Sequence, residues 1–280
     1  MQNKLVRMLG IKHPIIQGGM LRIAGARLTA AVSNAGGLGT LGQTPDVEAW
    51  RQEIIRTKAM TDKPFAVNLP MHAGELERRL QIIRDEGVKI VVSAAGNPKP
   101  VVSELKAAGI IIMHVVAAVD QAQKVEAAGV DAIVAEGGES GGMVAKDRVS
   151  TLVLVPLVAD AVKVPVIAGG GIADGRGLVA ALALGAQAVQ MGTRFIAAME
   201  CEAPEEWKAA VCRARETDTA VVPRGKAQGR VLKEEVIAGG LMAGQIAGMI
   251  KRVETVKEII DRVMAEAGPA LERIEKQMKL

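Results

Sequence analysis

Short apolar runs alternate with longer amphipathic stretches along most of the chain. Several runs, such as residues 89–95 and 110–116, are apolar at nearly every position instead of every second one. Continuous apolar runs are typical of parallel strands whose two faces are both buried. The pattern predicts eight strands, at His13–Gln17, Leu38–Leu41, Pro64–Leu69, Lys89–Ala94, Ile110–Val116, Ala132–Ala135, Val164–Ala168 and Ala188–Met191.

The stretches between these runs have the spacing of amphipathic helices. Several end in a glycine just before the next strand, as at Gly36, Gly87 and Gly109. Glycine in this place supplies the left-handed residue that ends a helix. Helices are predicted at Arg27–Asn34, Val47–Lys58, Glu75–Glu86, Pro100–Ala107, Gln121–Ala127, Thr151–Val162 and Gly175–Leu184.

Eight successive strand and helix units predict a (β/α)8 TIM barrel of the α/β class. A doubly wound sheet is the alternative, but the even spacing and the lack of an evident crossover disfavour it. The rhythm ends after Pro223, and residues 233–280 predict two helices, with Val253, Val256 and Ile260 at helical spacing. We therefore expect a barrel over residues 1–222, and a lid segment with C-terminal helices packed on the barrel over residues 223–280.

Composition excludes several classes of protein. Hydrophobic residues make up 49% of the 280 positions, which rules out a disordered chain. Only four side chains are Phe or Trp and none is Tyr, so a base-stacking platform for nucleic acid is not expected. The net charge of +4 is mild and agrees with a mixed solvated surface.

The chain shows no signal for a membrane, a metal or disulfide bonds. Cys201 and Cys212 are too few for a disulfide framework or a structural zinc site, and no metal site is predicted. No stretch of 18 uncharged apolar residues occurs, and the N-terminus lacks the pattern of a signal peptide. We expect a cytoplasmic protein that acts on a small molecule, without a nucleic-acid or membrane partner.

Glycine runs follow the predicted seventh and eighth strands. Gly169, Gly170 and Gly171 end one strand, Gly192 and Thr193 end the other, and a helical pattern follows each. The backbone N–H groups of such loops converge on anions, and the loops after strands 7 and 8 are the recurrent phosphate site of TIM barrels. The alternative is that these glycines serve only to make tight turns.

Six stretches resemble the nitronate monooxygenase (2-nitropropane dioxygenase) family, which includes enoyl-ACP reductase II and NADH:quinone reductases. The matching stretches are HPIIQGGM (13–20), SNAGGLGTLG (33–42), KPFAVNLP (63–70), AEGGESGG (135–142), residues 165–195 and MAGQIAGMI (242–250). The resemblance implies a TIM barrel that holds FMN, with its phosphate on the two glycine loops and its ring beside the first strand. The cofactor-binding residues it implies are Gly19, Met20, Leu21, Asn68, Gly141, Gly169, Gly170, Gly171, Gly192 and Thr193.

The chain departs from the family at the residue that usually carries the proton chemistry. Members place His after the SGG motif, whereas this chain has Met143, whose thioether does not exchange protons. The catalytic residue is therefore unknown. His114 is a candidate because of its place near a strand end, and the plainer interpretation is a hydrogen-bonded buried histidine. Glu139 and Lys146 are further candidates.

A second departure lies in residues 213–240, which are fewer than the family usually has between the barrel and its last motif. A reduced lid suggests a more open flavin, or one that a second copy in a homo-oligomer closes. The basic residues Arg224, Lys226 and Arg230 are candidates to contact an anionic substrate, with a solvated loop as the default.

The resemblance implies a flavin-dependent oxidoreductase and leaves its reaction open. The first hypothesis is oxidation of nitronates or of NAD(P)H through FMN, with NADH or NADPH as a possible reductant. The first alternative is NAD(P)H-dependent reduction of an enoyl thioester, for which Met143 leaves the proton source unassigned. The others are an accessory FMN-binding protein and a quinone reductase.

Overall fold

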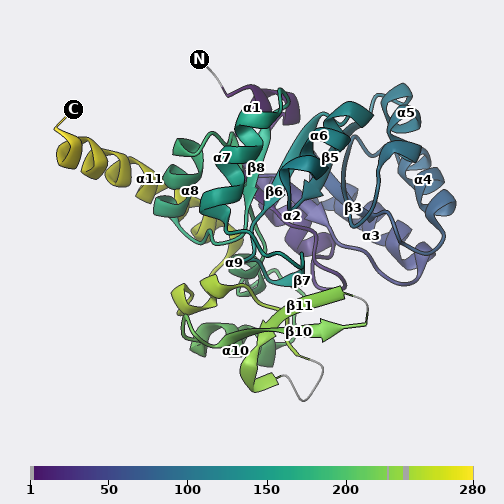
Figure 1. The fold of residues 1–280 in the computed structure, drawn as a ribbon. Helices are drawn as coiled ribbons and strands as arrows, with labels where there is room; N and C mark the ends of the chain where they lie inside the picture. The colour runs from purple at the N-terminus through teal and green to yellow at the C-terminus, as the bar shows by residue number, and fades with distance from the viewer. Residues whose placement is uncertain (1–2, 226, 236–239, 280) are drawn as a thin grey trace.

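Eight parallel strands form a barrel in the computed structural model, which describes residues 3–225, 227–235 and 240–279 (Figure 1). The strands pair in the order β1-β9-β8-β6-β5-β4-β3-β2, and a parallel bridge between Ile16 and Leu38 joins the two ends of the sheet. The predicted TIM barrel is confirmed. Its strands are β1 (Ile15–Gln17), β2 (Gly39–Leu41), β3 (Phe65–Pro70), β4 (Ile90–Ala94), β5 (Ile111–Val116), β6 (Ala132–Glu136), β8 (Val166–Gly169) and β9 (Ala188–Met191).

Helices between successive strands cover the outside of the barrel (Figure 1). Their starts follow from local capping: the Asp46 carboxylate accepts a hydrogen bond from the Ala49 N–H, and the Asp174 carboxylate accepts from two N–H groups of the first turn of its helix. The connecting helices are α2 (Ala26–Asn34), α3 (Val47–Met60), α4 (Leu76–Asp85), α5 (Lys99–Ala107), α6 (Val119–Ala128), α7 (Thr151–Ala161) and α8 (Gly175–Ala183).

The core has two layers, because alternate strand residues point to opposite faces of the sheet. Val91 and Ile112 pack outward against the helices, whereas Val92 and Met113 pack inside the barrel. Helix α1 (Lys4–Leu9), which the sequence pattern did not predict, adds Leu5 and Leu9 to the interior cluster. This alternation decides which side chains at the strand ends reach the barrel mouth.

A small antiparallel sheet lies beside one end of the barrel, in the order β10-β11-β7 (Figure 1). Its strands are β7 (Gly142–Val144), β10 (Thr219–Arg224) and β11 (Ala227–Leu232), and the nearby helices are α9 (Thr193–Ile196), α10 (Glu205–Arg213) and η1 (Lys233–Glu235). The boundary expected between residues 222 and 223 falls inside β10, and the division of the chain into two parts stays a proposal.

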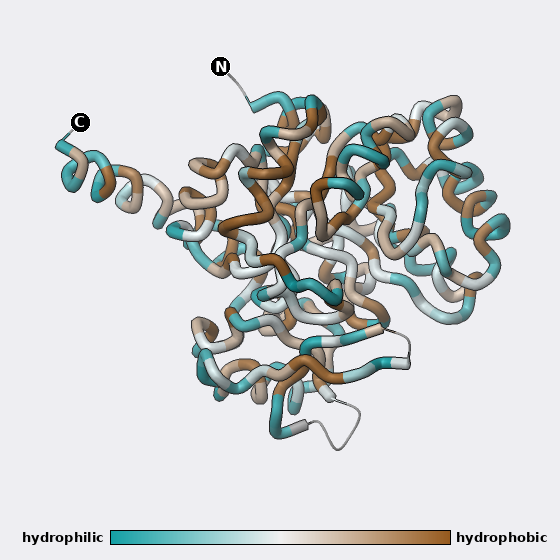
Figure 2. The backbone as a smooth tube through the Cα atoms, in the orientation of Figure 1, coloured by the Kyte–Doolittle hydropathy of each residue, from teal (hydrophilic) through white to brown (hydrophobic). Residues whose placement is uncertain are grey.

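Where two helices were expected in residues 233–280, the described residues there form one long α-helix and short 3-10 helices. Helix α11 (Val256–Met278) follows the short 3-10 helix η2 (Gln245–Met249). The α-helix starts where Thr255 and Glu258 form a capping box, so Val253 lies outside it. Helix α11 packs on α8 and α2, and its last turns project from the body with mixed hydropathy (Figure 2). No helix in the described ranges combines the length and apolarity needed to span a membrane.

Candidate functional site

The mouth at the carboxyl end of the barrel is lined by strand-end residues that face its interior. Val134, Ile167 and Ala188 belong to the interior cluster, so the residues two positions later face the same way. Applied to all eight strands, this alternation identifies the inward-facing residues at the strand ends: Gly18, Thr40, Asn68, Ala94, Val115, Glu136, Gly169 and Gln190. Most of these side chains are small or polar, which sets the mouth apart from the apolar interior below it.

The chain after β1 runs close over two of these side chains. A Cβ atom on Gly19 would lie 2.5 Å from the Cβ of Asn68, and one on Gly18 would lie 3.3 Å from the Cγ of Gln190. The Asn68 amide also donates a hydrogen bond to the Val92 carbonyl at 3.2 Å. Glycine at positions 18 and 19 thus brings bare backbone against the amide side chains of the mouth.

Thr151 and Glu139 hold the glycine loop after β8. The Glu139 carboxylate accepts hydrogen bonds from the Thr151 N–H and hydroxyl, at the start of α7. The same hydroxyl lies 3.3 and 3.0 Å from the Gly169 and Gly170 carbonyls. Gly170 and Gly171 have φ values of 89° and 72°, a region that favours glycine. Glu139, a catalytic candidate from sequence, is therefore engaged in fixing this loop.

The loops after β6 and β9 meet at a third segment, residues 243–245. The Gly244 N–H donates to the Thr193 hydroxyl at 2.8 Å, and the Gln245 N–H donates to the Glu139 carbonyl at 3.0 Å. A Cβ atom on Gly141 would lie 2.5 Å from the Gly244 nitrogen. The fold thus brings the expected cofactor residues Gly141 and Thr193 together through Gly244.

The two glycine loops fit a phosphate group. The described residues provide no acceptor for the backbone N–H groups of Gly171, Thr193 and Arg194, and no side chain in the described ranges caps α9. A Cβ atom on Gly192 would meet only the Met20 sulfur, at 3.9 Å. Unpaired N–H groups at a helix start beside an open glycine are the features that bind anions.

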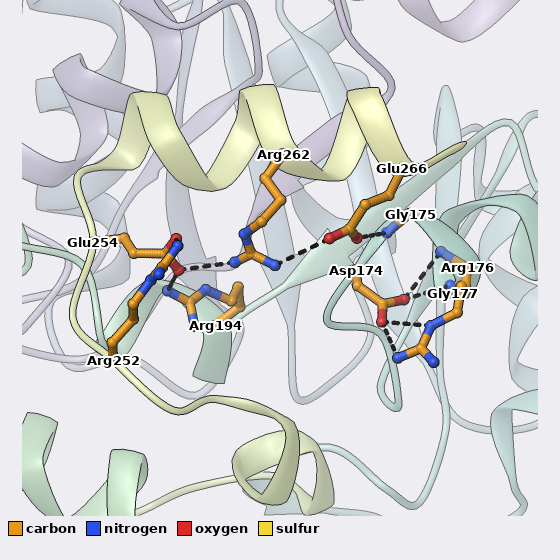
Figure 3. A network of polar contacts seen from close by, with 9 residues as sticks. All are labelled: Asp174, Gly175, Arg176, Gly177, Arg194, Arg252, Glu254, Arg262 and Glu266. Carbon is orange, nitrogen blue, oxygen red and sulfur yellow. Dashed lines mark hydrogen bonds and ion pairs between the residues drawn. The ribbon is translucent and has the colours of Figure 1, made fainter. Parts of the chain in front are cut away.

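A buried ion network lies behind the β9 loop (Figure 3). The Glu254 carboxylate pairs with Arg194, Arg262 and Arg252 at 2.9, 2.8 and 3.0 Å. The side chains of Arg194 and Glu254 are almost fully buried, whereas Arg252 is exposed. Arg194 follows Thr193 directly, so this network fixes α9 against the segment that leads into α11.

Met143, at the usual histidine position, lies in β7 with half of its surface exposed. It pairs in register with Gly229 of β11, and the adjacent Arg230 donates a hydrogen bond to the Gly138 carbonyl at 2.7 Å. Arg230 is thus occupied in holding the loop after β6. Lys226, the other basic candidate of this segment, lies outside the described residues.

Two of the residues expected beside the flavin ring differ in exposure. Met20 packs partly against the core and approaches Gly192, whereas Leu21 is 60% exposed. The carbonyl of Met20 accepts hydrogen bonds from the N–H groups of Ile23 and Ala24, which fixes this turn. The mouth therefore has apolar side chains open to solvent on the side of β1.

His114 lies on the outer face of the barrel and does not reach the mouth. It follows Met113, which points inward, and its Nδ1 shares a 2.7 Å hydrogen bond with the Ser93 hydroxyl. Burial lowers the pKa of His114 to about 4, opposed by a hydrogen bond with the Gly96 backbone. His114 therefore fits the plainer interpretation of the sequence, a buried histidine that is neutral and hydrogen-bonded.

Glu136 is a mouth residue that the sequence analysis did not single out. It is the last residue of β6 and is Cα partner to Gly169. Burial raises the pKa of Glu136 to about 7, with the Ser140 hydroxyl acting in the opposite direction. The sequence did contain a sign of this place. Glu136 comes directly after a predicted strand and directly before the glycine-rich motif, and it lies two residues after Val134, so both side chains point to the same face of the sheet.

Comparisons with known proteins define the class. The family model for nitronate monooxygenase matches residues 2–77 and 70–239, and the chain belongs to this family, whose members are flavin-dependent oxidoreductases. A Rhodococcus jostii protein named (3aS,4S,5R,7aS)-5-hydroxy-7a-methyl-1-oxo-octahydro-1H-indene-4-carboxyl-CoA dehydrogenase is 37% identical, over 89% of this chain and 71% of its own. A probable nitronate monooxygenase of Staphylococcus aureus is 34% identical, over 79% of this chain and 75% of its own.

Among solved structures, FabK from Thermotoga maritima superposes with a TM-score of 0.92 at 37% identity. The match covers 99% of each chain. The fold of this chain therefore corresponds to that of FabK along nearly the whole length. The chain is an oxidoreductase of the nitronate monooxygenase family with a FabK-like structure.

Proposed function

We propose that the barrel mouth binds FMN and that the bound flavin oxidises or reduces a small-molecule substrate. The observation that carries the proposal is the pair of glycine loops at Gly169–Gly171 and Gly192–Thr193, with unpaired N–H groups at the start of α9. The FMN phosphate would lie on these groups. The flavin ring would lie beside Gly19, Met20, Leu21, Asn68 and Gly141.

Electron transfer is the chemistry that FMN supplies here, and the protein contributes binding and orientation. Met20 and Met143 offer thioether surface, and the amides of Asn68 and Gln190 offer hydrogen bonds. The Gln190 Oε1 atom is buried without a hydrogen-bond partner among the described residues. A buried acceptor without a donor carries a free-energy cost, which a donor on a bound ring would offset.

The first substrate class is nitronates. A nitronate is already anionic and needs no base at position 143, where the thioether of Met143 offers none. The slightly basic balance of the chain, net +4, agrees with an anionic reactant. NADH or NADPH is the proposed alternative donor of electrons.

Acyl thioesters are a second class, favoured by the relatives. Proteins named as a carboxyl-CoA dehydrogenase are 37–39% identical to this chain. A thioester reaction requires proton exchange at the carbon beside the carbonyl. The mouth would then have to provide a proton carrier other than residue 143.

A second copy of the chain is a further part of the proposal. Leu21 and Met143 are 60% and 50% exposed, although both belong to the expected flavin side of the mouth. A partner subunit that covers them would remove apolar surface from water and complete the short lid. Light scattering of the FMN-loaded protein tests this, since a monomer at working concentration contradicts it.

The experiment that tests the function is an anaerobic reduction series on the FMN-loaded protein. NADH, NADPH and ethyl nitronate are mixed with it in turn, the flavin absorbance is followed, and the reduced flavin is then mixed with crotonyl-CoA. Bleaching by ethyl nitronate supports the first class, and bleaching by NADH or NADPH followed by reoxidation with crotonyl-CoA supports the second. Bleaching by none of them contradicts a redox function and favours an accessory FMN-binding protein.

A further inference from the structure

Glu136 has a distinctive place among the residues of the mouth. Val134 points into the barrel, so the alternation of the strand directs Glu136 inward at the carboxyl end of β6. Of the eight inward strand-end residues named above, all within the described part of the chain, Glu136 alone carries an ionisable side chain. The carboxyl ends of strands are where TIM barrels place their reacting groups.

The neighbours of Glu136 leave its carboxyl group without a charged partner. On β8 it faces Gly169, and a Cβ on that glycine would lie 3.7 Å from the Glu136 Cβ. On β5 the register partner of the preceding residue is Val116. From its own loop, the neighbouring Ser140 hydroxyl is uncharged and makes no hydrogen bond among the described residues.

Charged groups on the neighbouring segments are engaged elsewhere. Glu139 binds the start of α7 at Thr151. Arg230 of β11 donates to the Gly138 carbonyl and to the Thr219 hydroxyl. Burial therefore dominates the titration of Glu136 and raises its pKa to about 7. A group with a pKa near the working pH is suited to both donate and accept a proton.

The two sequence candidates for proton transfer do not fill this role. His114 points to the opposite face of the sheet and bonds Ser93. Met143 has no exchangeable proton. Glu136 adjoins the same Gly169 loop that forms the proposed phosphate cradle, so its carboxyl group lies within the proposed flavin site and not in a separate cavity.

We propose that Glu136 is the acid–base residue of this site, exchanging a proton with the substrate carbon next to an activating nitro or thioester carbonyl group. This inference rests on the proposed FMN function. With a neutral nitroalkane, the C–H bond breaks, its electron pair stays on the substrate as the nitronate, and the proton binds a Glu136 oxygen. In enoyl-thioester reduction the Glu136 O–H bond breaks as the C–H bond forms, and a bound flavin reduced by NAD(P)H would supply the hydride for the neighbouring carbon.

In both directions water restores the starting protonation of the carboxyl group. Part of the Glu136 residue is exposed, so water has access to the residue although burial dominates the titration of its carboxyl group. The nitronate itself bypasses the residue, because its carbon proton is already gone. Comparing nitroethane with ethyl nitronate therefore distinguishes loss of the base from loss of the flavin chemistry, because only nitroethane needs the base.

The test compares FMN-loaded wild type, Glu136→Gln, Glu136→Asp and the control Glu77→Gln. Glu77 is exposed on α4 and makes no hydrogen bond or ion pair within the described residues. Anaerobic flavin reduction is measured with nitroethane and with ethyl nitronate, and reoxidation of the NADH-reduced flavin is measured with crotonyl-CoA.

Glu136→Gln is expected to lose at least about 100-fold in rate with nitroethane or crotonyl-CoA, as the loss of a general acid or base does. It is expected to keep ethyl nitronate reduction within about threefold, to remove the pH inflection near 7, and to bind FMN normally. Glu136→Asp recovers part of the rate. An unchanged rate and pH profile in Glu136→Gln overturn the proposal, as does a wild type that reacts with ethyl nitronate or NADH but with neither nitroethane nor crotonyl-CoA. A wild type that no compound reduces contradicts the proposed function instead.

A readout independent of turnover is the titration of glutamate carboxyl carbons by ¹³C NMR on the protein without added substrate. Wild type is expected to show one glutamate with a midpoint near pH 7, absent from Glu136→Gln and present in Glu77→Gln. A spectrum in which every glutamate titrates below pH 5.5 overturns the assignment.

Discussion

Glu136 and Gln190 stand in one register row of the barrel, on either side of Gly169. Glu136 is the Cα partner of Gly169 on β6, and Gln190 is its partner on β9. The residue between them lacks a side chain, so only backbone separates the two polar residues in this row. A carboxyl group that titrates near neutrality and an unpaired amide oxygen thus flank the loop that we assign to the FMN phosphate.

Gly192→Leu is expected to weaken FMN binding by at least about tenfold without unfolding the protein. A Cβ at Gly192 meets only the Met20 sulfur, and φ is −107°, so the backbone accepts a side chain. The leucine would fill the space that we assign to the flavin. Gly74→Leu is the control, since a Cβ there meets nothing within 4 Å. Fluorescence titration with FMN measures the change, and equal affinity in both variants would remove Gly192 from the site.

Glu136 is expected to make the stability of the FMN-free protein depend on pH. Its pKa is raised from 4.5 in the unfolded chain to about 7 in the fold. The folded state therefore keeps a proton that the unfolded state has lost, and stability falls as pH rises from 4.5 to 7. Glu136→Gln has no carboxyl group to titrate at this position, so its stability does not fall in this way. The free energy of unfolding of the variant minus that of wild type is expected to rise by on the order of 2 kcal/mol between pH 5 and pH 8.

Urea unfolding at both pH values measures this difference. Glu77→Gln is expected to follow wild type. A Glu136→Gln variant whose pH dependence equals that of wild type would mean that the carboxyl group is solvated in the fold.

Glu254→Gln is expected to destabilise the protein by about 3–5 kcal/mol, because Arg194 would stay buried without its carboxylate. Arg252→Met removes an exposed partner of the same carboxylate and is expected to cost less than about 1 kcal/mol. Burial alone would raise the pKa of Glu254, but hydrogen bonds from Arg252 and Arg262 and the charge of Arg194 lower it overall. Its contribution is thus complete above pH 4.5 and is lost as pH falls through the lowered pKa.

Thermal unfolding of the two variants at neutral and acidic pH checks this contrast. Similar losses in both would show that the network does not depend on burial. Because Arg194 follows Thr193, the Glu254→Gln variant is also expected to bind FMN more weakly than Arg252→Met.

Met143→His is expected to leave stability within about 0.5 kcal/mol, since the side chain is half-exposed on β7. The imidazole would add a proton carrier with an ordinary pKa near 6.5 at the position where the family usually has one. In the Glu136→Gln background it should restore part of the nitroethane rate. No recovery in the double variant, with FMN bound, would place residue 143 too far from the reacting carbon.

Local patterns predicted the barrel because each strand and helix is encoded by neighbouring residues. The eight apolar runs and the helix-ending glycines such as Gly36 and Gly87 need no distant partner. The small sheet was missed because Gly142–Val144 forms a strand only by pairing with β11, more than eighty residues later. Of the helices described in the C-terminal segment only α11 is a long α-helix, and it starts late because Thr255 caps it.

The residue that carries the proton chemistry was harder to assign from sequence. Whether a strand residue faces the barrel interior or the helices depends on its exact position in the strand, since successive side chains alternate. A shift of one residue separates Met113, inside the barrel, from His114, on its outer face. The role of Glu139 was hidden because its partner Thr151 starts the next helix. The glycine loops were found from sequence because their chemistry belongs to the backbone and to their order along the chain.

The most direct test of the account is equilibrium titration of the purified, flavin-free protein with FMN and with riboflavin. We predict one FMN per chain, and an affinity for riboflavin at least about tenfold lower, because riboflavin lacks the phosphate that the Gly171 and Thr193 loops are assigned to bind. Binding of neither compound, or equal affinity for both, would contradict the assignment of the barrel mouth as an FMN phosphate site.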